Sequence, residues 1–207
     1  MNDSTRSDSV TAQSKTLTNP DSVETVSLPY DNPVFLVGMM GAGKTTIGRQ
    51  LARALGREFI DLDLALEERC GVRVATIFEI EGEEGFRRRE TAMLEELAHK
   101  PGIVLATGGG AVLAERNRHC LKKNGVVVYL RASGDELYRR VARDRNRPLL
   151  QTENPKARLL ELLSQREPLY DEVASLVFET GNMPVSQAVR ALILQLQGYD
   201  IHDDGQR

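Results

Sequence analysis

Short apolar runs alternate along the chain with longer segments that carry apolar residues at helical spacing. The runs suit buried strands of a parallel sheet and lie at Val34–Val37, 59–60, Ile103–Ala106, 126–130 and Leu176–Glu179. After the first run, Ile47, Leu51 and Leu55 recur on one helical face. Gly56 is placed to end that helix.

The segments between the later strands are also predicted to be mostly helical. Residues 64 to about 99 form one such stretch, with breaks at Gly71, Gly82 and Gly85. A helix is predicted over 134–143, and the polar, proline-containing residues 144–155 are predicted to be a loop. Two further helical pieces are expected before the last strand, and the closing helix has one face made by Val185, Val189, Leu192 and Leu196.

This alternation of strands and helices predicts an α/β fold, a three-layer α/β/α sandwich around a parallel sheet. Ligands of such folds bind at the carboxyl ends of the strands. The segments 38–45, 61–63 and 108–110 each follow a predicted strand directly. We therefore expect them to meet at one edge of the sheet.

Length and composition fit one domain with an ordinary core. The chain has 207 residues, of which 41% are hydrophobic and 28% are charged. Ordered structure is predicted over 33–197. Residues 1–32 contain many Ser and Thr and no apolar stretch typical of a secretory signal, so we expect a disordered N-terminal extension. Residues 198–207 are expected to be a C-terminal tail.

Charge and cysteine content narrow the classes of function. The net charge of −3 argues against a nucleic-acid partner, and no apolar run is long enough to predict a membrane span. The two cysteines, Cys70 and Cys120, form neither a zinc motif nor a disulfide framework. A reducing compartment, the cytoplasm, is the simplest expectation.

The segment after the first strand matches the phosphate-binding motif G-x-x-x-x-G-K-[ST] in full at 38–45. Its glycines let successive backbone N–H groups point at phosphate oxygens, and the following helix adds its positive N-terminal end. Lys44 is expected to reach the β- and γ-phosphates, and the Thr45 hydroxyl to ligate Mg²⁺. The predicted contacts to ATP in this loop are Gly41, Ala42, Gly43, Lys44, Thr45 and Thr46.

The motif predicts a nucleotide site and leaves the acceptor open. The base-recognition and switch motifs of a GTPase are absent from the sequence. An ATP motor would have a strand that ends in a metal-binding Asp, whereas Ile103–Ala106 runs into Thr107 and three glycines. These observations favour an ATP-dependent kinase that acts on a small molecule.

Asp61 and Asp63 stand two residues apart at the end of the second strand. One could act on the Mg²⁺ ion through its waters while the other aligns an acceptor hydroxyl and accepts its proton. Asp63 could equally be the N-cap of the next helix. Spacing alone does not choose between these roles.

Arginines and glycines supply further candidates. Most arginines of this chain are expected to lie on solvated helix faces, but Arg147 precedes a proline in a polar loop that suits a mobile lid. Lid closure would bring its guanidinium to the transferring phosphoryl group. The glycines at 108–110 permit close backbone approach to a ligand, or form a simple tight turn.

Taken together, the motifs resemble those of the shikimate kinase family from residue 33 to about 197. The resemblance is carried, in order along the chain, by GMMGAGKTT, FIDLD, IFEIEGEEGFRRRE, LATGGGAV, RNRPLL and REPLY. It implies transfer of the γ-phosphoryl group of ATP to the 3-hydroxyl of shikimate. It also implies the fold of the nucleoside monophosphate kinases, with five parallel strands in the order 2-3-1-4-5.

The resemblance also assigns roles to single residues. It implies that Asp63 holds the substrate hydroxyls as the base, and that Arg87 and Arg166 clamp the shikimate carboxylate. Gly109 and Gly110 would add backbone contacts to the substrate. The remaining implied roles are Arg147 at the phosphates, Arg140 beside adenine, Asp61 on Mg²⁺ through water, Glu90 as the acid that orients Arg87, and Phe86 beside the substrate or in the core.

Two other functions remain open at this point. A kinase for another hydroxylated acid, such as gluconate, would keep Lys44 and Thr45 without the full set of later motifs. A nucleotide-binding module without catalysis would have lost Lys44, Thr45, Asp63 or Arg147, and all four are present. We expect a monomer with ATP and Mg²⁺ as cofactors and shikimate as the small-molecule substrate.

Overall fold

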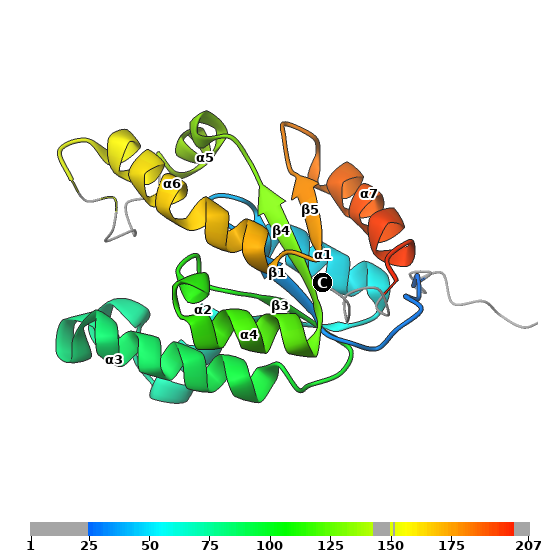
Figure 1. Cartoon of the computed structure of the whole chain (residues 1–207), viewed down its shortest axis with the longest axis horizontal. Coiled ribbons are helices and arrows are strands. Elements are labelled where there is room, and N and C mark those ends of the chain that lie inside the picture. The colour runs from blue at the N-terminus through cyan, green and yellow to red at the C-terminus, as the bar shows by residue number, and fades with distance from the viewer. Residues whose placement is uncertain (1–24, 143–149, 151, 201–207) are drawn as a thin grey trace, which may run out of the picture.

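The computed structural model describes residues 25–142, 150 and 152–200 (Figure 1). The predicted three-layer fold and its parallel sheet are confirmed, with strand order β2-β3-β1-β4-β5. The strands are β1 (Val34–Val37), β2 (Glu58–Asp61), β3 (Ile103–Ala106), β4 (Val126–Arg131) and β5 (Leu176–Glu179). The helices are α1 (Lys44–Leu55), α2 (Leu62–Cys70), α3 (Val74–Leu97), η1 (Ala111–Leu113), α4 (Glu115–Asn124), α5 (Gly134–Val141), α6 (Pro155–Val173) and α7 (Val185–Gln197).

Helices cover both faces of the sheet, as the buried apolar strands require. α1 and α7 contact each other on one face, and α4 and α6 contact each other on the other face (Figure 1). β1 and β3 are buried at every position. The carboxyl ends of β1, β2 and β3 therefore open together at one edge, where the loops that follow them carry the candidate site.

α1 lies close against the sheet because Gly48 has no side chain. A Cβ at Gly48 would stand 2.9 Å from Leu36 Cδ1 of β1 and 2.6 Å from Phe59 Cε2 of β2. Such contacts are too short for any other residue without a shift of the core. This packing fixes the start of α1, and with it the phosphate loop, relative to the ends of β1 and β2.

The glycines between β2 and β3 have different effects. Gly71 ends α2 in the left-handed conformation, as expected for a C-cap glycine. Gly82 kinks α3 with φ of 69°, whereas Gly85 lies within the helix and does not break it. The prediction of two helical pieces before β5 was wrong, because one helix, α6, runs unbroken from Pro155 to Val173 with Pro168 inside it.

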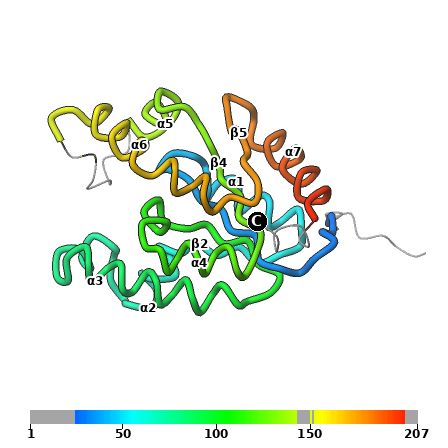
Figure 2. The backbone as a smooth tube through the Cα atoms, in the orientation of Figure 1, coloured from blue at the N-terminus to red at the C-terminus, as the bar shows by residue number. Residues whose placement is uncertain are grey.

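Residues 25–32 precede the expected domain start at residue 33, and they pack on the domain. Val26 N–H donates to Ala54 O at 2.9 Å, and the Tyr30 hydroxyl donates to Leu196 O at 3.1 Å. Figure 2 shows this first segment, in blue, beside the end of α7, in red. Within the described part of the chain, no helix is long and apolar enough to cross a membrane.

Candidate active site

The phosphate loop curls between β1 and α1. Gly41 and Gly43 have φ of 81° and 97°, the left-handed region that favours glycine. The Lys44 ammonium donates to the carbonyls of Gly38 at 2.7 Å and Met39 at 3.0 Å, so the side chain lies back over the loop. The N-terminal turn of α1, with its outward N–H groups, opens onto the same space.

The carboxylate of Asp61 joins this loop to the end of β2. Its Oδ2 accepts a hydrogen bond from the Thr45 hydroxyl at 2.8 Å, and its Oδ1 accepts from the N–H groups of Asp63 and Leu64. Asp61 is thus the N-cap of α2. The alternative role of Asp63 as the cap is therefore wrong, which leaves the Asp63 carboxylate available for another role.

Asp63 lies in the first turn of α2, and its Oδ1 is buried without a hydrogen-bond partner among the described residues. Burial raises the pKa of this carboxyl above its ordinary value, the negative charge of Asp61 raises it further, and Lys44 and Arg87 oppose both effects. A carboxylate that has one buried oxygen without a hydrogen-bond partner and a raised pKa is suited to accept a hydrogen bond and a proton from an alcohol.

In the loop after β3, the Gly108 backbone lies close to the carboxylates of Glu90 and Asp63. A Cβ at Gly108 would stand 2.7 Å from Glu90 Oε1 and 3.0 Å from Asp63 Oδ1. Only a glycine allows the backbone this close, so its place here reflects close approach rather than a simple turn. Glu90 is fully buried, and burial raises its pKa above the ordinary value of 4.5.

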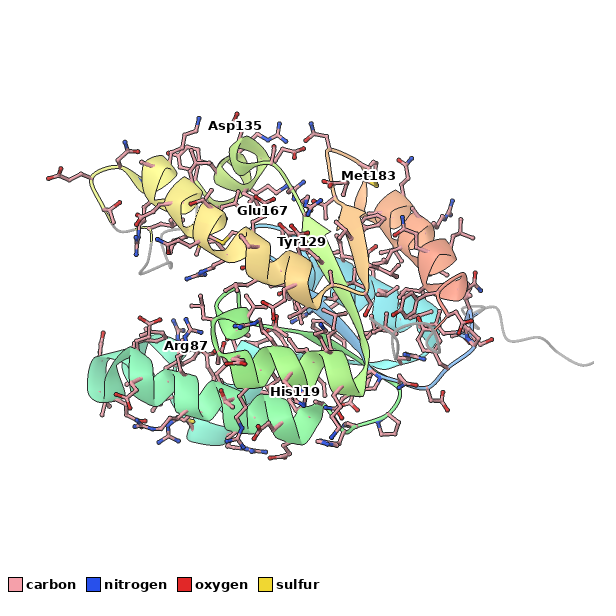
Figure 3. All side chains as sticks on the ribbon, viewed as in Figure 1. Arg87, His119, Tyr129, Asp135, Glu167 and Met183 are labelled. Atoms are coloured by element: carbon pink, nitrogen blue, oxygen red, sulfur yellow. The ribbon has the colours of Figure 1, made fainter. Side chains whose placement is uncertain are left out.

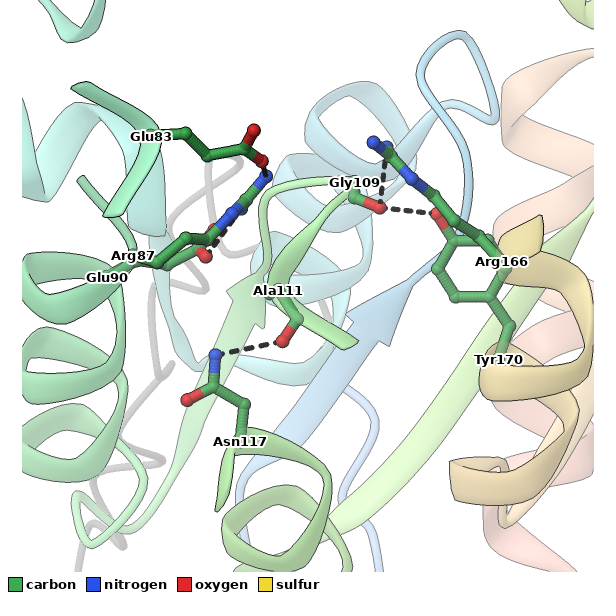
Figure 4. A network of polar contacts seen from close by, with 8 residues as sticks. All are labelled: Glu83, Arg87, Glu90, Gly109, Ala111, Asn117, Arg166 and Tyr170. Carbon is green, nitrogen blue, oxygen red and sulfur yellow. Dashed lines mark hydrogen bonds and ion pairs between the residues drawn. The ribbon is translucent and has the colours of Figure 1, made fainter. Parts of the chain in front are cut away.

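Arg87 lies on α3 beside the last of these glycines. Its guanidinium donates to Glu90 at 2.7 Å and to Glu83 at 3.2 Å, the first being the contact that the resemblance implied (Figure 4). A Cβ at Gly110 would lie only 2.7 Å from Arg87 Cζ, so the guanidinium covers the Gly110 backbone. Phe86 is buried and stacks on Phe78 with ring centroids 4.5 Å apart, which places it in the packing of α3.

Arg166 approaches the same loop from α6. It is buried, and its Nη1 donates to the Gly109 carbonyl at 3.2 Å, where the Tyr170 hydroxyl also donates. In Figure 4, Arg87 and Arg166 reach the segment around Gly109 from opposite sides. The Nε atoms of both arginines are buried without partners among the described residues. Two such cations beside one glycine loop are suited to bind a carboxylate.

Arg140 of α5 ties the phosphate loop to the loop after β5. It donates to Gly41 O at 3.2 Å and to the Thr180 hydroxyl at 3.1 Å, and also to the Gly181 carbonyl. Sequence reasoning assigned no individual binder in 180–184. Thr180, Met183 and Val185 of this region line the cavity that is described next. Figure 3 shows that Met183 lies well apart from Arg87, so the two mark different parts of the site.

A cavity of about 540 Å³ unites these parts. Its wall contains the whole predicted ATP loop and Arg140 on one side, and Asp61, Asp63, Thr107 and Gly109 on the other. Arg87, Gly110 and Arg166 are not part of this lining, and the two arginines contact the glycine loop from α3 and α6. The structure therefore brings together the sequence-predicted residues that it describes, while Arg147 and most of the expected lid at 144–155 lie outside the described residues.

The donor set fits Mg²⁺. Thr45 and Asp61 offer hard oxygen atoms at the phosphate loop, and Mg²⁺ is commonly held by one or two such side chains together with substrate phosphates and water. Among the described residues, no group of three or more His, Cys, Asp or Glu side chains forms a self-sufficient metal cage. A metal that arrives with the nucleotide agrees with this arrangement.

Comparison with known proteins identifies the group to which such a site belongs. The family model described as shikimate kinase matches residues 40–197, which include every residue that lines the cavity, together with Arg87 and Arg166. The chain belongs to the shikimate kinase family. Shikimate kinases are ATP-dependent phosphotransferases, and the sequence motifs, the strand order and the cavity agree with that chemistry.

Individual shikimate kinases are similar over most of their length. The shikimate kinase of Bordetella avium (strain 197N) is 65% identical over 173 residues, which cover 84% of this chain and 83% of the relative. A solved structure, a shikimate kinase from Acinetobacter baumannii in complex with shikimate, is 46% identical with a TM-score of 0.79. The matched region covers 82% of this chain and 95% of the chain in that structure.

The alternative of a gluconate kinase is represented by a more distant structure. A gluconokinase from Sinorhizobium meliloti 1021 is 18% identical with a TM-score of 0.56, and covers 81% of this chain and 92% of its own. At that identity the likeness shows a shared fold alone. The family of this chain is the shikimate kinase family.

Proposed function

We propose that this chain transfers the γ-phosphoryl group of ATP to the 3-hydroxyl of shikimate and releases shikimate 3-phosphate and ADP. The observation that carries the proposal is the single cavity in which Lys44 and Thr45 face Asp63 and Gly109. A phosphate cradle and a buried acceptor carboxylate in one space are what direct phosphoryl transfer to an alcohol requires.

The nucleotide side uses the phosphate loop. Backbone N–H groups from Gly41 to Thr46 hold the phosphates, Lys44 turns from its loop carbonyls to the β- and γ-phosphates, and Arg140 lies beside the base. Thr45 directly and Asp61 through water would hold Mg²⁺, which when bound neutralises charge on the phosphate oxygens. Arg147, from outside the described residues, is proposed to meet the transferring phosphoryl group.

The acceptor side uses the groups around the glycine loop. Arg87 and Arg166 pair with the shikimate carboxylate, and backbone groups of Gly109 and Gly110 contact the substrate. Asp63 accepts a hydrogen bond from the 3-hydroxyl, orients its lone pair towards the phosphoryl group and takes the proton as the new O–P bond forms. The support is the unpaired, buried Oδ1 of Asp63 and the shikimate in the Acinetobacter structure.

The setting proposed for this reaction is a monomer in the cytoplasm. Cys70 and Cys120 are both free thiols, which agrees with a reducing compartment. The site is built from one chain, since each described site residue contacts others of the same chain.

A coupled assay of ADP release tests the proposed function. The protein is given MgATP with shikimate, gluconate or quinate in turn. Turnover with shikimate alone is expected, because the chain belongs to the shikimate kinase family and Arg87, Arg166 and Asp63 are proposed to hold the carboxylate and one hydroxyl of that acid in a fixed geometry. Turnover with gluconate in preference to shikimate would replace the proposed substrate, and ATP binding without turnover of any acid would point to a module without catalysis.

A further inference from the structure

The hydroxyl of Tyr170 reaches the acceptor loop from α6. The side chain is fully buried, and its hydroxyl donates a hydrogen bond of 2.5 Å to the Gly109 carbonyl. The same oxygen lies 3.8 Å from the Met39 sulfur in the phosphate loop. One phenol therefore touches both the loop after β1, 131 positions away in the sequence, and the loop after β3, 61 positions away.

Tyr170 shares its acceptor with an arginine of the proposed acid site. Arg166 lies one helical turn earlier on the same face of α6 and donates Nη1 to the same Gly109 carbonyl at 3.2 Å (Figure 4). A carbonyl with two lone pairs can accept both bonds at once. The Tyr170 hydroxyl thereby restricts the position of the Arg166 guanidinium, since both groups donate to the same carbonyl oxygen.

Fixing this carbonyl also fixes the next N–H group. In a trans peptide the C=O and N–H bonds point in opposite directions. With the Gly109 oxygen held towards α6, the Gly110 N–H points away from α6, which is the side where the Arg87 guanidinium covers the Gly110 backbone. A glycine peptide has little intrinsic preference for one orientation, so an external anchor decides it.

We propose that Tyr170 is a positioning residue for the acid-binding half of the site, holding the Gly109–Gly110 peptide and the Arg166 guanidinium in place before the substrate arrives. The inference rests on the proposed function, because its consequence is affinity for the carboxylate substrate. Burial raises the pKa of the phenol well above its ordinary value, so the hydroxyl remains a protonated donor throughout the working range of pH.

A second buried tyrosine provides the matched control. Tyr129 of β4 is equally buried, and its ring centroid lies 5.0 Å from that of Tyr170. Its ring lies under the Arg131 guanidinium, which pairs with Asp171 at the surface. Within the described part of the chain, no hydrogen bond joins the Tyr129 side chain to residues 108–110, whereas one joins Tyr170 to Gly109. A buried hydroxyl that serves stability alone would behave alike at both positions.

The test is steady-state kinetics of Tyr170→Phe and Tyr129→Phe with MgATP and shikimate. Tyr170→Phe is expected to raise KM for shikimate about five- to tenfold, the cost of losing one hydrogen bond of the pocket, with KM for ATP within about twofold of wild type. Tyr129→Phe is expected to leave both constants unchanged. Equal effects of the two variants, equal shifts of both Michaelis constants, or an unchanged KM for shikimate would overturn the proposal.

Hydrogen exchange on the wild-type protein keeps the proposal testable if Tyr170→Phe does not fold. The Ala111 N–H donates to the Gly108 carbonyl at 3.1 Å across the Gly109–Gly110 peptide. In the ligand-free protein this amide is expected to exchange nearly as slowly as those of β3, because the turn that it closes is already held. Exchange as fast as in the exposed turn at 71–73 would overturn the positioning role. Absence of wild-type turnover with shikimate would instead refute the proposed function, so the two failures are distinct.

Discussion

The Thr45 hydroxyl donates a hydrogen bond of 2.8 Å to one oxygen of Asp61, and the other oxygen of Asp61 caps α2. The two residues come from the start of α1 and the end of β2, so this bond fixes the phosphate loop against the acceptor strand. Asp61 consequently has two roles, the structural role of capping α2 and the electrostatic role of its negative charge. Different substitutions of Asp61 can separate these roles.

Asp61→Asn is expected to keep the cap and lose the charge. An amide oxygen can still accept from the N–H groups of Asp63 and Leu64, so the melting temperature should change little. The Mg²⁺ concentration for half-maximal activity should rise about tenfold, since a carboxylate that orients metal-bound water is gone. Asp61→Ala should add a loss of about 1 kcal/mol in the free energy of unfolding. A magnesium requirement equal to that of wild type in both variants would remove Asp61 from the metal site.

Asp63→Asn is expected to lower kcat at least a hundredfold, the usual contribution of a base to proton transfer, while affinity for ATP barely changes. Glu67→Gln is the matched control, because Glu67 lies one turn further along α2 and its carboxylate accepts from the Val74 N–H away from the cavity. Quenched-reaction measurements give kcat and nucleotide titration gives the affinity for ATP, so the effect on each is measured separately. Near-normal turnover of Asp63→Asn would mean that Asp63 is not the base.

Arg87→Ala is expected to raise KM for shikimate about tenfold or more and to change KM for ATP far less, since a charge-assisted pair to the substrate carboxylate is lost. Its neighbour Arg88 pairs with Glu84 on the exposed side of α3, so Arg88→Ala should leave both constants unchanged. Steady-state kinetics with each substrate varied in turn measures this. Proportionate rises for shikimate and ATP in Arg87→Ala would indicate a structural role.

The buried carboxyl of Glu90 should leave a signature in the dependence of stability on pH. Because its pKa is raised in the folded state, the folded protein binds more protons than the unfolded chain above the ordinary value of 4.5. The contribution of Glu90 to the free energy of unfolding therefore falls as pH rises from 4.5 to the raised pKa, and is constant beyond it.

Glu90→Gln removes that titration and keeps an acceptor for Arg87. The stability of the variant relative to wild type is thus expected to increase with pH over this interval, as followed by urea denaturation at successive pH values. The ion pair with Arg87 is already included in the folded-state pKa of Glu90, and any change in packing around the new amide adds an offset that does not depend on pH. If the free energy of unfolding of Glu90→Gln minus that of wild type stays constant or decreases with pH, the raised pKa of Glu90 is contradicted.

Much of the framework could be predicted from local sequence. The bounds of β1 and β3 match the apolar runs, because buried parallel strands leave a continuous apolar signal. The bounds of β5 also match, although only Phe178 is buried in this edge strand. The phosphate loop was predictable because its glycines and lysine are consecutive. The strand order followed from resemblance to a family and not from periodicity, which says nothing about neighbours in a sheet.

The rest depends on contacts between distant segments. Spacing could not decide whether Asp63 caps α2, because the cap depends on which carboxylate oxygen meets the N–H groups of the first turn, and in the structure that oxygen belongs to Asp61. Two helical pieces were expected before β5, yet a single helix, α6, continues through Pro168. Tyr170 stands one turn after Arg166, a spacing that could have flagged it, but its acceptor on Gly109 is a tertiary contact.

Phosphorus NMR of the reaction with shikimate and MgATP tests the central claim most directly, because it identifies the product. The account predicts that the γ-phosphate signal of ATP is replaced by a single phosphomonoester signal, assigned by its coupling to the proton at carbon 3 of shikimate, with stoichiometric ADP. Release of inorganic phosphate alone, or a phosphoester at another hydroxyl, would contradict it.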